Sequence, residues 1–168
     1  MKKALFFLII VCMLFVSCKD KGNESASNPA ATTPLEGTWK KSETDTTLNI
    51  TTEQIFVFAG TNISFTFSMK DSSANPATTI MTLVYTGTFR LDNANLYVKF
   101  NAVSYTDTTH TTPITDPAAI ASAMQATSLP MPADNTEFLL GTYAINGNQL
   151  TITSTSSGST STETFIKP

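Results

Sequence analysis

His110 is the only histidine of the 168-residue chain, and it is the side chain best suited to acid–base chemistry near neutral pH. Ser104, Asp107 and Asp116 lie near it in the sequence, so a hydrolytic set of nucleophile, histidine and carboxylate is one interpretation. Serine and aspartate are common, however, and the sequence contains no Gly-x-Ser-x-Gly, no glycine-rich phosphate loop and no His-Glu-x-x-His. We therefore expect His110 to be an exposed loop residue, and we expect no catalytic residues and no enzymatic activity.

The residues that would bind a metal, a cofactor or nucleic acid are also few. A single histidine cannot supply the ligands of a usual zinc site. Four aspartates lie in turn-like stretches, where such side chains hydrogen-bond the local backbone, and they lack EF-hand spacing: Asp45, Asp71, Asp92 and Asp107. The formal net charge of −3 would be repelled by phosphates. We therefore expect no metal, no cofactor and no nucleic-acid partner.

The first 18 residues have the organisation of a secretory signal. Lys2 and Lys3 give a basic start, and an uninterrupted apolar run occupies residues 4–16. As a helix this run would cover about 20 Å, less than the ~30 Å hydrocarbon core of a bilayer, whereas a secretory apolar region has this length. A buried core helix fits poorly, because the run has no polar face. The pattern predicts a signal peptide over residues 1–17.

The run ends in Phe15-Val16-Ser17-Cys18, which resembles the lipobox of bacterial lipoproteins, although that family prefers Leu at the position of Phe15. The resemblance implies cleavage before Cys18 and attachment of acyl chains, including palmitate, to this cysteine. The membrane would then be the first partner of the protein, and we expect a lipid-anchored location in the bacterial cell envelope, at the outer membrane. Two or three acyl chains would hold the protein firmly, at about 0.8 kcal/mol for each buried CH₂.

Residues 18–34 are predicted to be the lipidated tether of a folded domain over residues 35–168. After Cys18 the stretch contains small and polar residues interrupted by Pro29 and Pro34, so it can bury almost nothing. As a random coil, 16 such residues reach about 20–24 Å. This length would hold the folded domain clear of the lipid headgroups.

The folded domain is predicted to be all-β. The chain contains 30 Thr and 16 Ser, and Thr is favoured in strands and unfavourable inside helices. Apolar and polar residues alternate with period two, as in the stretches 63–70 and 96–103, which is typical of strands with one face in a core. The stretches that begin at Gly87-Thr88-Phe89 and Gly141-Thr142-Tyr143 repeat one hairpin pattern.

This alternation predicts an antiparallel up-and-down meander of about 8–9 strands. Asp116 followed by Pro117 gives an N-cap and a proline at the first helical position, so one short helix is expected near 117–127. The pattern leaves open whether the strands form a closed barrel or an open sandwich. The predicted strands are 35–41, 46–51, 54–59, 62–70, 79–91, 95–106, 137–145, 149–155 and 161–167.

The opening Gly37-Thr38-Trp39, together with Gly-Thr-Tyr-x-Ile-x-Gly-Asn-x-Leu at residues 141–150, resembles the bacterial lipocalin-like lipoproteins. The resemblance implies a lipocalin-like barrel in which Gly37 and Trp39 form the plug of the closed end. Lipocalins commonly pack an Arg from the last strand on this Trp, whereas the last strand here offers Lys167. From physics alone, Trp39 is equally well an ordinary core residue.

An eight-stranded barrel is about wide enough either to be filled by side chains or to hold one small ligand. Six aromatic residues on alternating strand faces are therefore candidates to line a ligand cavity, and core packing is the alternative for each: Phe65, Phe67, Tyr85, Phe89, Phe100 and Tyr143. The first functional hypothesis is a non-catalytic module that binds a small hydrophobic or amphipathic ligand. The second is a surface-exposed structural lipoprotein that contacts host or envelope components and has a packed barrel without a small ligand.

Overall fold

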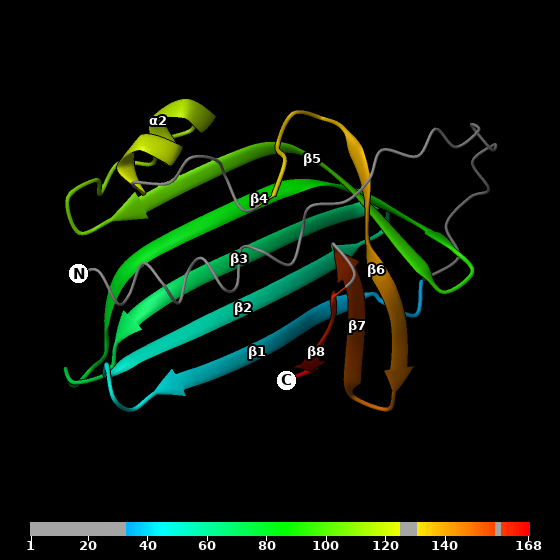
Figure 1. The fold of residues 1–168 in the computed structure, drawn as a ribbon, viewed down its shortest axis with the longest axis horizontal. Coiled ribbons are helices and arrows are strands. Elements are labelled where there is room, and N and C mark those ends of the chain that lie inside the picture. The colour runs from blue at the N-terminus through cyan, green and yellow to red at the C-terminus, as the bar shows by residue number, and fades with distance from the viewer. Residues whose placement is uncertain (1–32, 125–130, 157–158) are drawn as a thin grey trace.

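The computed structural model describes residues 33–124, 131–156 and 159–168, which form a barrel of antiparallel strands (Figure 1). Eight strands follow one another in sequence order, and each is hydrogen-bonded to the next around the closed barrel. They are β1 (Gly37–Asp45), β2 (Ile50–Ala59), β3 (Asn62–Asp71), β4 (Thr78–Asp92), β5 (Asn95–Asp107), β6 (Glu137–Asn146), β7 (Gln149–Ser156) and β8 (Ser159–Ile166). The predicted all-β up-and-down barrel is confirmed, and the predicted signal peptide lies outside the described residues.

The prediction of separate strands at 46–51 and 54–59 was wrong. The structure has one strand there, β2, and residues 46–49 form the turn that leads into it. The Asp45 carboxylate accepts hydrogen bonds from the backbone N–H groups of Thr47 and Leu48, and Asn49 has a φ of 53°. Asp and Asn stabilise such turns, so they outweigh the strand preference of the neighbouring threonines. The barrel therefore has eight strands.

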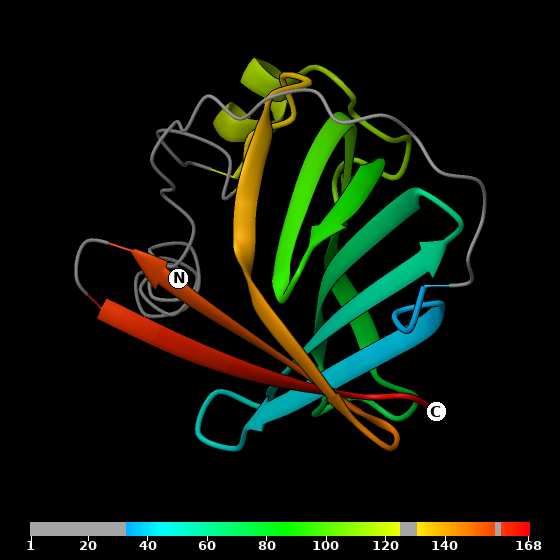
Figure 2. The ribbon, with the colours of Figure 1, turned by 90° about the vertical axis from the view of Figure 1, so that its right-hand side faces the viewer.

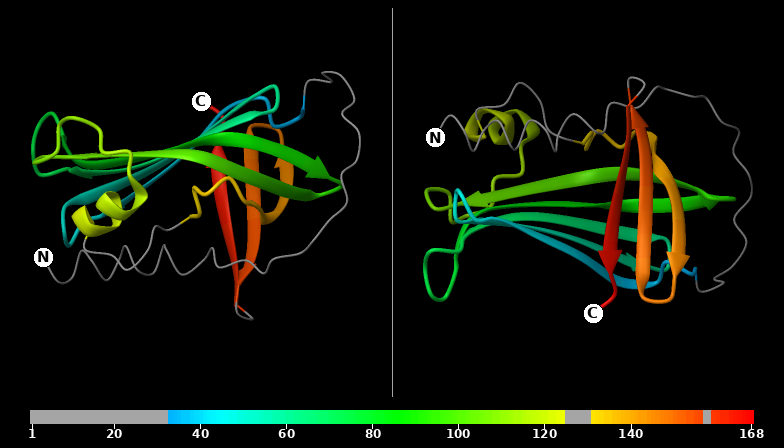
Figure 3. Two further views of the ribbon diagram at one scale, coloured as in Figure 1. Left: turned by 90° about the horizontal axis from the view of Figure 1, so that it is seen from above. Right: turned by 60° about the horizontal axis from the view of Figure 1, so that its bottom comes forward.

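The strands form two groups that cross at a steep angle. β1 to β5 run side by side as long strands, while β6, β7 and β8 cross over one end of them (Figures 1 and 3). Seen from the side of β6 to β8, the two groups enclose the space between them (Figure 2). The buried apolar residues of both groups pack there in one cluster.

One short helix, α2 (Pro117–Ala123), lies beside the end of β5 (Figure 1). The Asp116 side chain accepts a hydrogen bond from the backbone N–H of Ala119 at 2.8 Å, and Pro117 is the first helical residue, as predicted. Ile120 is fully buried and fixes the helix to the barrel. The helix ends at Ala123 with Met124 as its C-cap, and the later part of the predicted range, residues 125–127, lies outside the described residues.

Two neighbouring strand pairs share only short ladders. β5 pairs with β6 over residues Asn95–Lys99 of β5, and farther along the Phe100 carbonyl accepts a hydrogen bond from the backbone N–H of Asn135. β1 and β8 share one register pair, Lys40 with Ile166. Within the described residues the barrel is therefore closed at its β1–β8 seam by a single step of the ladder.

A bulge bends the sheet next to Gly87. The register between β4 and β5 shifts between Thr86 and Gly87, and the Lys99 carbonyl oxygen lies 2.0 Å from where a Cβ on Gly87 would be. Gly141 on β6 is in a similar position, because its Cβ would lie 2.5 Å from the Thr153 carbonyl oxygen on β7. Both glycines of the repeated hairpin pattern therefore allow two strands to approach closely at a bend.

Candidate ligand-binding site at the barrel seam

Trp39 and Gly37 lie at the start of β1, near the seam where the first strand meets the last strand, β8. Trp39 is 1% exposed, and its indole Nε1 donates a hydrogen bond to the Leu35 carbonyl oxygen at 2.7 Å. The Lys167 ammonium lies 5.2 Å from the centre of the Trp39 ring and donates to the Glu36 carbonyl oxygen at 2.8 Å. Lys167 thus makes a cation–π contact with Trp39.

Gly37 fits the same arrangement. Its φ is +115°, in the region that favours glycine, and a Cβ there would lie 2.9 Å from Lys167 Cε. Gly37 therefore leaves room for the lysine that covers Trp39. The role of Gly37 and Trp39 as a plug stays a prediction.

Five of the six aromatic candidates are buried, and four of these pack against other aromatic rings. Phe65 and Tyr85 have ring centres 6.4 Å apart, and Tyr85 and Phe100 have centres 5.2 Å apart. Phe89 meets Phe58 edge-to-face at 4.9 Å. Phe67 is 6% exposed, and Tyr143 is partly buried against the same cluster. These rings fill much of the barrel interior, and their contact with a ligand stays a prediction.

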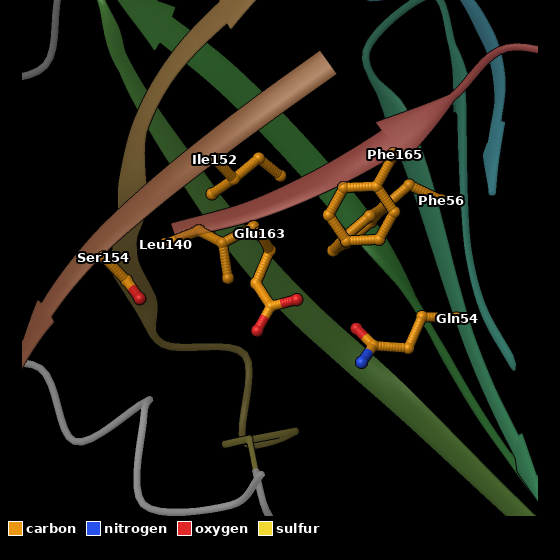
Figure 4. Close-up of a pocket in the computed structure, with 7 residues that line it drawn as sticks. All are labelled: Gln54, Phe56, Leu140, Ile152, Ser154, Glu163 and Phe165. Atoms are coloured by element: carbon orange, nitrogen blue, oxygen red, sulfur yellow. The ribbon is translucent and has the colours of Figure 1, made fainter. Parts of the chain in front are cut away.

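A pocket lies apart from these six candidates, between β2 and the group of strands β6, β7 and β8 (Figure 4). The space of about 290 Å³ that no atom occupies includes open solvent at its mouth, so the enclosed part is much smaller. Four apolar side chains and three polar ones line it: Phe56, Leu140, Ile152, Phe165, Gln54, Ser154 and Glu163. None of the six aromatic candidates is among them.

The mouth of the pocket carries an ion pair that bridges the barrel seam. Lys41 Nζ on β1 contacts Glu163 Oε2 on β8, and it also lies 3.0 Å from Glu43 Oε1. The Lys41 and Glu163 side chains are 17% and 22% exposed. Lys41 shares the inner face of β1 with Trp39, because residues two apart in a strand point the same way. The side-chain pair thus joins the two strands close to their single ladder step.

The ion pair of Lys41 with Glu163 was not predicted from the sequence, although one signal could have indicated it. Lys41 is two residues after buried Trp39, and Glu163 is two residues before buried Phe165. Period-two alternation therefore assigns both charged side chains to the inner face. A charge on an inner face needs a partner, so such positions are candidates for a site.

The residues considered for hydrolysis do not form a catalytic set. His110 is exposed, and its Nδ1 lies 3.0 Å from Asp107 Oδ1 in the loop after β5. Asp116 caps α2, and Ser104 makes no hydrogen bond with His110 in the described part of the chain. The structure therefore brings together only the histidine and Asp107.

The Asp107 carboxylate organises this loop. Desolvation opposes its charged form, but hydrogen bonds from Thr109, from the His110 backbone N–H and from the Tyr105 hydroxyl outweigh it and hold the pKa of Asp107 well below its usual range. Burial and the hydrogen bond to this carboxylate raise the pKa of Tyr105. These contacts account for the position of His110 as part of a turn.

Residues 33–124, 131–156 and 159–168 hold no group of three or more His, Cys, Asp or Glu side chains that could bind a metal ion. In the same ranges, no helix has the length and apolar character needed to span a bilayer. Comparison of the chain with family models, with curated proteins and with solved structures gives no match.

Proposed function

We propose that this protein is a membrane-anchored, lipocalin-like lipoprotein that binds a small hydrophobic or amphipathic ligand and has no catalytic activity. The observation that supports it best is the pocket at the barrel seam, which combines an apolar floor with three polar side chains. Sites for small molecules usually have this composition: mostly apolar walls with a few polar groups that orient the ligand. The Gly37-Thr38-Trp39 opening and the covered Trp39 are consistent with the lipocalin-like part of the proposal.

A ligand that enters this pocket would contact the side chains of Leu140, Ile152 and Phe165. Phe56 and Phe165 meet edge-to-face with centres 5.1 Å apart, so the floor is a rigid aromatic surface. Because the aromatic rings deeper in the barrel are packed against each other, the ligand would lie at the seam. A bound molecule would therefore lie across the open mouth, with a small or narrow apolar group against this floor.

The binding proposal is tested by what co-purifies with the protein. Small molecules extracted from natively purified protein are identified by mass spectrometry, and we expect one species in stoichiometric amount. Ile152→Phe should reduce its recovery, because the added ring occupies the pocket. Ile55→Phe is the matched control, since Ile55 pairs with outward-facing Lys40 on the outer face of β2. Recovery that stays unchanged in folded Ile152→Phe would contradict binding at this site.

The anchoring proposal rests on residues 1–18. Cys18→Ser removes the acyl attachment point, so the variant should not partition into detergent with the wild type and should stay an uncleaved precursor or be released. Mass spectrometry of the wild-type Cys18 peptide should show the added acyl chains. An unmodified Cys18 thiol in mature protein from membranes would contradict the proposal.

One observation favours the second candidate function, a structural or interaction lipoprotein. Five of the six aromatic residues proposed to line a cavity are buried in the core cluster instead, as a packed barrel without a ligand requires. Repeated native purification without any small molecule, together with one recurring protein partner, would favour this alternative over ligand binding.

A further inference from the structure

The polar side of the seam pocket offers mainly hydrogen-bond acceptors to a bound molecule. Glu163 uses Oε2 for its contact with Lys41, and no hydrogen bond of the described residues engages its Oε1. Figure 4 shows the Glu163 carboxylate and the Gln54 amide turned toward the same opening, with Ser154 on the side wall. A group that donates a hydrogen bond would therefore find an ionised acceptor at the edge of the apolar floor.

The charges at the mouth are unbalanced toward negative. Glu163 is the charged residue that lines the pocket, and Lys41 and Glu43 extend from it along the seam. The three side chains together carry a formal charge of −1. Lys41 already pairs with the Glu163 and Glu43 carboxylates, so it would attract a third carboxylate only weakly.

A ligand carboxylate would face two unfavourable choices at this mouth. It could lie beside Glu163 and be repelled, or it could displace Glu163 from Lys41 and leave a partly buried carboxylate without its partner. An alcohol avoids both, because it donates to Glu163 and leaves the Lys41 contact in place. An ammonium group also donates, and its charge offsets the excess negative charge.

We propose that the seam pocket selects apolar molecules whose polar end donates a hydrogen bond and is uncharged or cationic, and that it discriminates against carboxylates. This inference rests on the proposed ligand-binding function. Beyond that function, we infer which kind of polar group the ligand carries. Glu163 would recognise this group, and Lys41 and Glu43 would set the local charge.

The test compares three probes with the same eight-carbon chain: 1-octanol, octylamine and octanoate. Binding to the full chain in nanodiscs is measured by calorimetry at pH 7, and empty nanodiscs supply the reference for partition into lipid. We expect octanol and octylamine each to bind at least tenfold more tightly than octanoate. Octanoate that binds as tightly as either would overturn the inference and leave the proposed function standing. Binding of none of the three would overturn the proposed function at this pocket.

Substitutions then locate the effect. Glu163→Gln removes one negative charge from the mouth with almost no change in shape, so octanoate binding should improve at least threefold. Glu43→Gln, at the solvent edge of the cluster, should improve it in the same direction even if Glu163→Gln folds poorly. Glu137→Gln is the control, because it removes the same charge from the outer face, where Glu137 pairs with Arg90. An equal gain in all three variants, or no gain with Glu163→Gln and Glu43→Gln, would overturn the inference.

Discussion

Replacement of Gly87 by alanine should be among the most destabilising single changes in the barrel. An added Cβ would lie 2.0 Å from the Lys99 carbonyl oxygen and 2.8 Å from Phe100 Cα. Real Cβ atoms essentially never approach closer than 3.0 Å, so the Lys99 carbonyl would have to move by about 1 Å. This oxygen belongs to the backbone of β5 and cannot rotate away as a side chain would. β5 therefore has to shift, and buried Phe100 with it.

We expect the shift to lower the free energy of unfolding by about 3 kcal/mol, the upper part of the range for overpacking. For a domain of this size, the melting temperature would fall by roughly 10 °C. Urea unfolding followed by circular dichroism at 25 °C gives the free energy, and an unchanged m value shows that the unfolding reaction is the same.

Gly60→Ala is the matched control. Gly60 has a φ of +62°, and no heavy atom lies within 4 Å of a Cβ placed on it. Only the left-handed conformation opposes this substitution, at a cost of about 1–2 kcal/mol. A Gly87→Ala variant that is no more destabilised than Gly60→Ala would contradict the close approach of β4 and β5 at the bulge.

Three further tests address the core, the cover of Trp39 and the outer ion pairs. Phe100→Ala should lower the free energy of unfolding by about 3–5 kcal/mol in urea titrations, because it leaves a cavity in a fully buried position, whereas Val57→Ala on the outer face should change it by less than about 1 kcal/mol. Lys167→Met should cost about 0.5–1 kcal/mol and shift the Trp39 emission spectrum, and an unchanged spectrum would contradict the cation–π contact. Glu53 accepts hydrogen bonds from Lys40 and Lys70, which lower its pKa from 4.5, so its stabilisation is present above this pH and is lost as the pH falls. Glu53→Gln should therefore lower the melting temperature at pH 7, and the difference from the wild type should shrink at pH 3; a constant difference would contradict the assignment.

The strands could be predicted because period-two alternation is a local property of the sequence. It located β3 to within one residue at its end, and it assigned Phe65 and Phe67 to the inner face correctly. It failed at residues 46–49, where threonines with a strong strand preference occupy a turn that is fixed by Asp45. Alternation also indicates that a side chain points inward, but it does not say whether packing or an open space meets it there. Five of the six aromatic candidates accordingly lie in the packed interior.

The candidate site depends on contacts between distant parts of the chain. Lys41 and Glu163 are 122 residues apart, and they meet because β1 and β8 converge at the single pair of Lys40 with Ile166. The register of two strands so far apart is set by the whole barrel. The repeated Gly-Thr-aromatic pattern was visible in the sequence, but its role at bends of the sheet became clear only from the strands that approach Gly87 and Gly141.

The single step of the β1–β8 ladder leaves two strand edges in the described barrel without neighbours on that side. Such edges offer free N–H and C=O groups to any other extended chain, so they favour aggregation between copies. Here each edge carries a charged side chain on its inner face, Lys41 on β1 and Glu163 on β8. A foreign strand that added to either edge would have to enclose that charge apart from its partner, which is costly. The ion pair at the seam thus places on both edges an inward charge of the kind that disfavours pairing with a foreign strand.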